Sequence, residues 1–346
     1  MPIAVAPGHE VQALPQPYLL FLGDVTEAGY AKTAFGLRDW APERCIGEFA
    51  CAGATVCTGL PAMTPAQARA RGARAMVIGI ANPGGRIPDS WLPALLAALQ
   101  AGLDLVGGMH ARLSDIELLR VAARTHGRRL IDVRQPPAAL PVASGRKREG
   151  RRLLTVGTDC ALGKKYTALA LARAFRERGV DAEFRATGQT GILIAGAGIP
   201  MDAVVADFAA GAAEALSPDA DPAHWDVIEG QGSLSHPAYA GVSLALLHGS
   251  QPDVIVVCHA HGRTRVLGVP GYALPSIEET IELNLRLGAR TNPAIRCAGV
   301  SLNTAGLDAQ AAQRAIEDTA QRLGLPVADP IRGGADFSRL VGHCLA

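Results

Sequence analysis

Short apolar segments of strand type alternate with helical patterns along the whole chain. The clearest apolar segments are residues 75–80, 152–156 and 253–258, and helical patterns follow at 91–101 and 164–178. Buried strands that alternate with helices are typical of parallel sheets whose two faces are covered by helices. The pattern therefore predicts an α/β fold.

Glycines and capping residues mark the expected helix ends. Gly102 and Gly127 each follow a helical pattern, at the position where a glycine commonly ends a helix. Ser114 and Glu117 are spaced as in a capping box, so a helix is expected to begin there. Further strands are expected at 18–22, 103–106, 129–133, 183–186, 225–228 and 295–301, and further helices at 29–40, 201–215, 276–287 and 308–323.

Residues 135–150 (QPPAALPVASGRKREG) interrupt this alternation, because they are rich in proline and end in a basic cluster. We expect a first domain at 1–137, a linker at 138–150 and a second domain at 151–346, and a chain of 346 residues is long enough for two domains. The first domain lacks the Gly-x-Gly-x-x-Gly fingerprint after a strand, which argues against a nicotinamide cofactor.

Composition excludes several classes of protein. Hydrophobic residues make up 49% of the chain and charged residues 19%, which rules out wholesale disorder. The formal net charge of +1 gives no footprint for duplex nucleic acid or an anionic membrane. Residues 1–10 lack the layout of a secretory signal, and no apolar run is long enough to cross a bilayer. We expect a soluble, cytoplasmic protein, and the neutral charge balance and large apolar share fit a homo-oligomer.

The chain has seven cysteines, and no two of them form a Cys-x-x-Cys pair. An odd number without paired spacing argues against a disulfide framework and against a structural zinc site. Buried thiols in a reducing compartment are expected, and no metal site is predicted.

The strongest chemical signal is residues 157–165 (GTDCALGKK), between an expected strand and an expected helix. A glycine-bounded turn that leads into a helix directs backbone N–H groups and the positive end of the helix dipole at one point, where phosphate oxygens fit. The predicted phosphate-binding residues are Gly157, Thr158, Cys160, Gly163, Lys164 and Lys165.

Two departures from the usual phosphate loop change its interpretation. The loop is one residue longer than Gly-x-x-x-x-Gly-Lys-[Ser/Thr], and Lys165 occupies the position whose hydroxyl ordinarily holds magnesium. Thr167 is about 200° further around the helix axis and does not replace that hydroxyl. The sequence therefore favours a phosphate-bearing ligand held without the standard metal arrangement, such as a phosphate-rich acyl carrier.

Several motifs carry a resemblance to known families. The long loop together with EGQGSL at 229–234 resembles dethiobiotin synthetase-type P-loop proteins. A likeness over almost the whole chain rests on ATGQTG at 186–191, on 229–236 with 239–242 and 247–250, and on GVSLNT at 299–304. These runs resemble the DgcN-like family, formerly a domain of unknown function. The resemblance implies a Rossmann-like parallel-sheet domain followed by a P-loop α/β domain.

The resemblance also implies an activity: acetyl transfer from acetyl-CoA to the amine of a D-amino acid, D-glutamate in the characterised members, as a step of D-amino-acid catabolism. The acetyl-CoA is then a co-substrate, and no tightly bound cofactor is expected. The residues leave the amino acid and its enantiomer open. Alternatives are an ATP- and magnesium-dependent ligase or kinase, with Asp159 and Glu229 holding the metal, and a non-catalytic sensor of CoA or nucleotide.

Acetyl transfer needs a base, donors for an oxyanion, and cations for the carboxylates of the substrate. Glu229 and His236 follow a strand end and are candidate bases for direct attack by the amine. Asp159 is the third candidate catalytic residue, expected to bind the substrate ammonium group or a cation, or to cap its own turn. Cys160 offers a two-step alternative, because a thiol at a helix N-terminus has a lowered pKa. The candidate substrate-binding residues are Arg185, Gln189, Thr190, Tyr239 and Arg263.

In the first domain, Asp24, Arg86 and His110 follow three expected strands. They are expected either to form a rim that closes an interdomain site over the second domain or to make an oligomer contact.

Overall fold

The computed structural model describes residues 14–346, which divide into two compact units. The first unit holds the described residues up to Pro136 together with Ile192–Pro200, and the second holds Pro137–Gly191 and Met201–Ala346. Residues 1–10, on which the expectation of no secretory signal rests, lie outside the described part of the chain.

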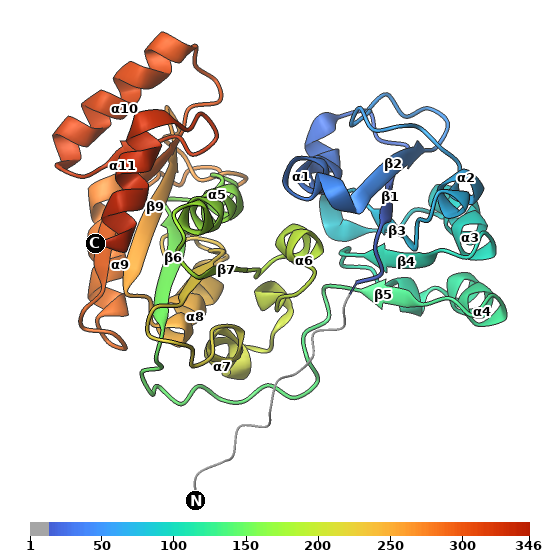
Figure 1. The fold of residues 1–346 in the computed structure, drawn as a ribbon, viewed down its shortest axis with the longest axis horizontal. Coiled ribbons are helices and arrows are strands. Elements are labelled where there is room, and N and C mark those ends of the chain that lie inside the picture. Colours follow the sequence, from blue (N-terminus) through green and yellow to red (C-terminus); the bar gives the residue numbers. More distant parts are fainter. Residues whose placement is uncertain (1–13) are drawn as a thin grey trace, which may run out of the picture. The chain divides into compact units, whose positions relative to one another are not determined.

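The first unit contains a five-stranded parallel sheet in the order β2-β1-β3-β4-β5 (Figure 1). Every residue of β1, β3 and β4 is buried, which explains the continuous apolar runs of β1 and β3; β4 begins with the buried Asp104. The strands are β1 Tyr18–Gly23, β2 Cys45–Ala50, β3 Ala75–Ile78, β4 Asp104–Gly107 and β5 Leu130–Asp132, and the helices are α1 Lys32–Trp40, α2 Pro65–Ala70, α3 Leu92–Gln100 and α4 Glu117–Thr125.

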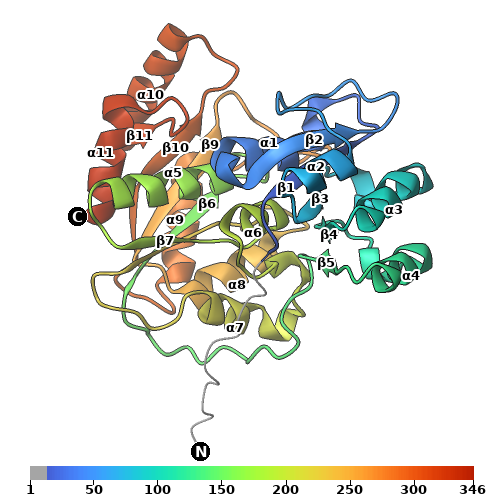
Figure 2. The same cartoon turned by 45° about the vertical axis from the view of Figure 1, so that its right-hand side comes forward.

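The second unit contains a six-stranded parallel sheet in the order β11-β10-β9-β6-β8-β7. Its strands are β6 Arg151–Gly157, β7 Ala182–Arg185, β8 Trp225–Ile228, β9 Val254–Ala260, β10 Arg296–Asn303 and β11 Val327–Ala328. Its helices are α5 Lys164–Glu177, α7 Ala206–Leu216, α8 Ala240–Ser250, α9 Ile277–Gly288, α10 Ala309–Leu323 and α11 Gly334–Leu345. Helix α6 Gln189–Ala195 begins in this unit, and its residues from Ile192 onward belong to the first unit. Helices α5 and α11 pack together on one face, and α8 and α9 on the other (Figures 1 and 2).

The central strand β6 is the switch point of this parallel sheet, because successive strands are added first on one side of it and then on the other. The chain passes from β6 to β7 and β8 on one side, and then crosses to β9, β10 and β11 on the other. Ligands of open α/β sheets bind at the carboxyl ends of the strands beside such a switch point. The loops that follow β6, β8 and β9 are therefore placed to build a site together, with Gly157 beside Cys258 and Leu154 beside Ile228 in the register.

The expected α/β fold is confirmed, and one local expectation is wrong. The helix predicted after Ser114 exists as α4, but it begins at Glu117 with Ile116 in the N-cap position and no side-chain cap. Ser114 lies in a short 3₁₀ turn, where its backbone N–H donates to Asp132 Oδ2 at 3.3 Å. The carboxylate of a neighbouring strand has taken over the role that the spacing had assigned to a capping box.

The basic cluster at residues 146–148 is folded against the second unit, although residues 138–150 contain no helix or strand. Arg148 is 6% exposed and donates hydrogen bonds to the carbonyl oxygens of Ser217 and Gly249. Arg146 and Lys147 pair with Asp219 and Asp253. The segment is thus a fixed strap, because its cations are used to satisfy carbonyls and carboxylates of the domain that follows.

Candidate functional site

The loop between β6 and α5 has the geometry of an anion cradle. Gly163 is the N-cap of α5 with φ 107°, a left-handed conformation that a residue with a side chain rarely adopts. Within the described residues, no hydrogen bond takes up the backbone N–H groups of Ala161, Leu162 and Gly163. Free N–H groups at the start of a 14-residue helix attract phosphate or carboxylate oxygens.

Lys164 folds back inside this loop. Its side chain is buried, and Nζ donates to the carbonyl oxygen of Asp159 at 2.6 Å. Burial lowers the pKa of Lys164, while nearby thiols and carboxylates, Asp159 and Glu229 among them, oppose the shift. Lys165 lies over the Tyr166 ring, 4.5 Å from its centroid. Lys164 therefore lies inside the loop, whereas Lys165 packs on an aromatic ring.

The threonines around the loop are committed to the protein. Thr158 Oγ1 is hydrogen-bonded to His259 Nδ1 at 2.9 Å, and Thr167 Oγ1 to Ser301 Oγ at 2.8 Å. The Thr167 hydroxyl is thus turned towards the sheet, as its position around the helix axis had predicted. Neither hydroxyl is therefore placed like the serine or threonine hydroxyl that holds magnesium in a standard phosphate loop.

Asp159 is fully buried and receives hydrogen bonds from three directions. Oδ1 accepts from the Cys160 backbone N–H at 2.7 Å, and Oδ2 accepts from the Leu267 backbone N–H at 2.9 Å and from Arg263 Nη1 at 3.2 Å. A buried carboxylate is tolerated in this loop because Arg263 neutralises it. Asp159 therefore caps its own turn and ties the loop after β6 to the loop after β9.

His236 faces Asp159 from the loop after β8 and is 3% exposed. Its Nδ1 accepts a hydrogen bond from the Ala238 backbone N–H at 3.1 Å, which places the proton of the neutral ring on Nε2. Nε2 lies 4.0 Å from Asp159 Oδ1, and the Tyr239 ring lies against the imidazole at 4.5 Å between centroids. The ring is thus held as a donor that points towards the phosphate loop.

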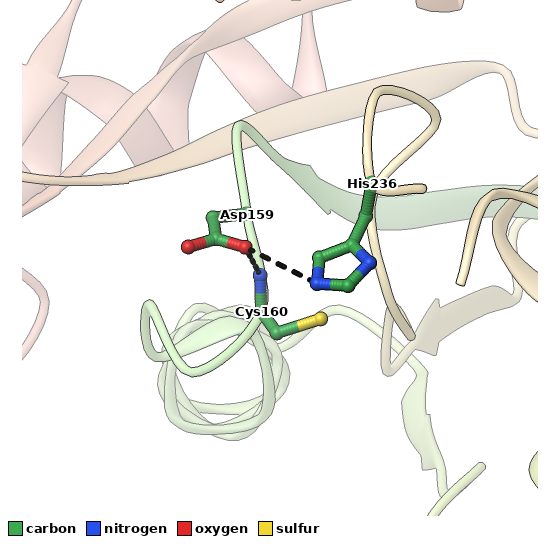
Figure 3. A group of neighbouring side chains, drawn as sticks. All are labelled: Asp159, Cys160 and His236. Carbon is green, nitrogen blue, oxygen red and sulfur yellow. Dashed lines mark hydrogen bonds and ion pairs between the residues drawn. The ribbon is translucent and has the colours of Figure 1, made fainter. Parts of the chain in front are cut away.

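Cys160 completes a cluster with these two side chains (Figure 3). One ligand-type atom from each of Asp159, Cys160 and His236 lies within 4.8 Å of the other two, and the Cys160 sulfur points towards the imidazole. Burial raises the pKa of the Cys160 thiol, although the charges of Lys164 and Arg263 act to lower it. The lowered pKa expected from the helix terminus is therefore wrong, because desolvation outweighs the cations.

The same three side chains could hold a metal by their composition, but the tautomer of His236 opposes it. A metal bound at Nε2 needs the lone pair of that nitrogen, whereas the Ala238 N–H already claims the lone pair of Nδ1. Arg263 and Lys164 add two cations next to the cluster. The arrangement suits a nucleophile and a hydrogen-bond donor better than a cation site.

Glu229, at the end of β8, holds the start of α6. Its Oε2 accepts the backbone N–H groups of Thr187 at 2.9 Å and of Gly188 at 3.2 Å. A side chain at Gly191 would collide with the same carboxylate, so the glycine lets the helix approach it. Burial raises the pKa of Glu229, and Lys165 is the strongest opposing influence. A carboxylate with a raised pKa is a stronger base than an exposed one.

Two domain models of one family match this chain. One is described as a domain of unknown function, the DUF1611 C-terminal P-loop domain, and matches residues 141–341. The other is described as the DUF1611 N-terminal Rossmann-like domain and matches residues 49–136. The chain belongs to the DUF1611 family.

Relatives and a solved structure extend over almost the whole DUF1611 chain. Proteins named D-glutamate N-acetyltransferase from a Pseudoalteromonas species and from Tritonibacter scottomollicae are each 48% identical, over 92% of this chain and 96% of their own length. The crystal structure of a DUF1611 family protein from Anabaena variabilis is 37% identical, covers 95% of this chain and 98% of its own, and has a TM-score of 0.83. The family resemblance and the two-domain fold expected from the motifs are confirmed.

Within the part of the DUF1611 chain that the structure describes, no helix is both long enough and apolar enough to span a bilayer.

The predicted substrate-binding residues of this DUF1611 chain fall into different environments. Arg185 is paired with Asp226 at 2.6 Å and with Glu183 at 3.0 Å, so its partners are strand residues and not members of the cluster. Gln189, at the start of α6, buries its Oε1 without a hydrogen-bond partner among the described residues. A buried acceptor without a partner is rare in proteins and fits an atom that receives a ligand.

Thr190, Tyr239 and Arg263 complete that predicted set. Thr190 is buried in the first turn of α6, whereas Tyr239 is 52% exposed beside His236. Arg263 donates through Nη1 to Asp159 and to the carbonyl oxygen of Cys160. Its Nη2 and Nε make no hydrogen bond within the described residues, so the guanidinium keeps donors for a further anion.

Two contributors to the site were missed by the sequence analysis. Thr155 lies inside β6, where its hydroxyl accepts from the Gly230 N–H and donates to the Lys164 carbonyl. Leu267 contributes only a backbone N–H, to Asp159. Thr155 reads as an ordinary buried strand residue and a backbone donor carries no residue signature, so neither left a signal in the sequence.

A groove of about 520 Å³ begins at Ser235, the residue before His236. Its volume lies in the range of small-ligand sites. Its charged lining residues are Glu279, Glu282 and Arg286. The two acidic groups make this groove a poor phosphate site compared with the loop before α5.

Proposed function

We propose that this protein transfers the acetyl group of acetyl-CoA to the amine of D-glutamate. The observation that carries the proposal is its 48% identity, across 92% of the chain, to two proteins named D-glutamate N-acetyltransferase. The matched stretch spans 92% of the chain and therefore reaches into both domains.

The phosphate loop supports CoA as the donor of the acetyl group. CoA carries a diphosphate and a ribose phosphate, and the N–H groups of Ala161, Leu162 and Gly163 together with Lys164 offer donors and charge for such oxygens. Lys165 replaces the hydroxyl that recruits magnesium in nucleotide hydrolysis. A fixed ammonium group suits an anion that arrives without a metal.

The groups that surround the loop match the needs of the amino acid. The free donors of Arg263 suit a substrate carboxylate, and the orphaned Gln189 Oε1 suits the substrate amine. Glu229, with its raised pKa, is our candidate for the base that removes a proton from the ammonium group. The chemistry balances: the amine nitrogen bonds to the acetyl carbon, the thioester C–S bond breaks, and CoA leaves as the thiol.

The experiment that tests this function follows CoA thiol release and chiral product formation in parallel. The full-length protein is given acetyl-CoA with D-glutamate, L-glutamate, D-aspartate or D-glutamine, and separately ATP and magnesium with each amino acid. We expect stoichiometric CoA and N-acetyl-D-glutamate. Consumption of ATP with no release of CoA would replace the proposal with a ligase or kinase, and binding of CoA without turnover of any amine would replace it with a sensor.

A cytoplasmic location remains our prediction from the odd number of cysteines without paired spacing, and a homo-oligomeric state remains our prediction from the neutral charge balance and the 49% apolar share. Light scattering coupled to gel filtration tests the assembly, and a monomer at micromolar concentration would contradict it.

A further inference from the structure

We propose that Cys160 accepts the acetyl group before the amino acid does, so that transfer passes through an acetyl-Cys160 thioester. The inference rests on the proposed function for its acetyl donor and deepens it by naming a covalent intermediate. It starts from the cluster of Asp159, Cys160 and His236, in which the thiol faces a buried imidazole (Figure 3).

The position of Cys160 places it within reach of the donor. It lies in the phosphate loop itself, three residues before Gly163, and its side chain is only partly buried. When the phosphates of CoA occupy the N–H groups of the loop, the pantetheine arm has to fold back over the loop to bring the thioester to the partly buried thiol. Proximity of this kind replaces a bimolecular encounter by an intramolecular one.

The environment of His236 supports the relay independently of the position of Cys160. It is 3% exposed, and Nε2 makes no hydrogen bond within the described residues, its nearest charged partner being Asp159 Oδ1 at 4.0 Å. Because the Ala238 N–H fixes the proton on Nε2, the ring offers an N–H donor to the cluster. That donor can stabilise the sulfur anion or the oxyanion as either develops. His236 therefore has a role in the relay, but as a donor and not as the base.

Asp159 and Arg263 act as positioning residues. Asp159 Oδ1 accepts the backbone N–H of Cys160, and Arg263 Nη1 donates to the Cys160 carbonyl oxygen. The peptide on both sides of the thiol is thus fixed by one ion pair, in which Nη1 and Oδ2 are 3.2 Å apart.

The two steps balance without an oxidant or a metal. In the first, Cys160 Sγ bonds to the acetyl carbon, the C–S bond to CoA breaks, and the thiol proton of Cys160 ends on the sulfur of CoA. In the second, the amine nitrogen bonds to the acetyl carbon, the C–S bond to Cys160 breaks, and a proton from the amine returns to Cys160. The first step exchanges one thioester for another and costs little free energy.

The other thiols lack these surroundings. Burial raises the pKa of Cys45 and Cys344 to about 12 and that of Cys297 to about 11, and Cys258 is enclosed beside Thr167. Cys51 is partly exposed and Cys57 is exposed, and neither belongs to the cluster. Cys57 is therefore a suitable control for adventitious acetylation of an accessible thiol.

The test mixes the full-length protein with acetyl-CoA in the absence of any amino acid. We expect a burst of one CoA per protein chain, an increase in intact mass by one acetyl group, and a hydroxylamine-sensitive acetyl on the peptide that contains Cys160. Addition of D-glutamate then discharges this acetyl to N-acetyl-D-glutamate. Because Cys160 rests as the thiol, the burst rate rises with pH.

Variants separate a covalent role from a structural one. C160A is expected to lose the burst and to reduce turnover by at least about 10³-fold, while calorimetric CoA affinity and the thermal unfolding temperature stay near those of the wild type. C57A keeps burst and turnover. If C160A turns over at the wild-type rate, the relay is wrong.

A matched pair of amides tests the role of His236. H236Q places an amide N–H near the position of Nε2, whereas H236N keeps an acceptor near Nδ1 and loses the donor. We expect acetylation of Cys160 in H236Q to exceed that in H236N by about 10-fold or more. Equal losses in both variants, together with loss of a pH-dependent step, would assign His236 as a base and contradict the donor role.

The failures of the two proposals are distinguishable. Formation of N-acetyl-D-glutamate with neither burst nor adduct overturns the relay and leaves the proposed function intact. A burst with an adduct on Cys160 but no transfer to D-glutamate supports the relay and overturns the substrate. Stoichiometric zinc in the purified protein, lost in C160A, overturns the relay in favour of a metal site.

Discussion

In each of the two sheets, the loop after the first strand contains an aspartate, and the two aspartates have different surroundings. Asp24 follows β1 of the first unit and is exposed; its carboxylate accepts from Trp91 Nε1 at 2.9 Å and from Ser90 Oγ at 3.2 Å. Asp159 follows β6 of the second unit, is fully buried, and is held by Arg263 and two backbone N–H groups.

The difference lies in what occupies the strand end. In the first unit the Trp91 ring, 1% exposed, packs edge-on against Phe21 of β1 with 5.5 Å between centroids, so an aromatic side chain fills the space. In the second unit the carboxylate is surrounded by a thiol, an imidazole and a loop whose N–H groups have no partner among residues 14–346. A buried charge is costly and is retained where chemistry uses it, whereas an aromatic plug serves packing.

The largest effect is expected from E229Q, which acts on the second unit alone. The amide oxygen still accepts the Thr187 and Gly188 N–H groups, so α6 stays in place, but the base is lost and turnover falls by about 10²- to 10⁴-fold. In the wild type, the raised pKa of Glu229 places an acidic limb in the pH–rate profile above its ordinary value of 4.5, with the rate rising as pH rises. E229Q lacks that limb.

D329N is the matched control for a buried carboxylate at another strand end. Asp329 is 5% exposed and accepts the Thr304 N–H and hydroxyl through Oδ2. We expect a loss of stability but an unchanged acidic limb. An E229Q enzyme that retains the wild-type pH profile would remove Glu229 from the role of base.

D159N tests the comparison directly. The substitution removes the negative charge that Arg263 pairs with, and the new amide N–H group faces other hydrogen-bond donors. We therefore expect a loss of about 3 kcal/mol in the free energy of unfolding of the second unit. The equivalent change D24N, in the first unit, costs less than about 1 kcal/mol because its site is exposed. Urea unfolding followed by domain-resolved hydrogen exchange measures both, and equal losses would erase the distinction between the two strand ends.

W91F removes the indole N–H and part of the ring from the plug of the first unit. We expect a loss of about 1–2 kcal/mol from the hydrogen bond to Asp24 and from the smaller volume. S90A, which removes the longer hydrogen bond to the same carboxylate, is the control and costs less. Neither change should alter CoA affinity; a tenfold weaker affinity in W91F would show that the plug supports the binding site.

The smallest effect concerns the pH dependence of Asp24. The indole hydrogen bond lowers the pKa of this carboxyl, so the bond favours the folded state at neutral pH and its contribution is lost as pH falls below the ordinary value of 3.8. The difference in unfolding temperature between wild type and D24N should therefore shrink in acid. A difference that grows on acidification would contradict this assignment.

Local signals in the sequence were reliable where one element decides the outcome. The strand, glycine turn and helix around residues 157–178 could be placed because apolar period, loop glycines and lysine all lie within one segment. Strand β2 was missed because Gly47 and Glu48 break its apolar run, yet Glu48 is buried and accepts from the Thr58 N–H at 2.7 Å. Helix α8 was missed because its helical period is masked by small residues and glycines.

The candidate site was predictable in part, for the same reason. Glu229, His236 and Asp159 were named from their strand-end positions, but Arg185 lies among partners on β7 and β8, which no sequence spacing reveals. The direction of the Cys160 pKa was also predicted wrongly, since burial of a side chain is a property of the whole fold.

By itself, the sequence determined the α/β class, the anion cradle and the family, because each of these depends on contiguous residues whose periodicity and turn chemistry are local. Only the tertiary structure decided that the loops after β6, β8 and β9 meet, so that the imidazole of His236 joins the adjacent Asp159 and Cys160, which lie more than 70 positions earlier in the chain. The physical reason is the switch of direction at β6, which brings distant strand ends side by side and sets their burial, and burial fixes which groups carry charge.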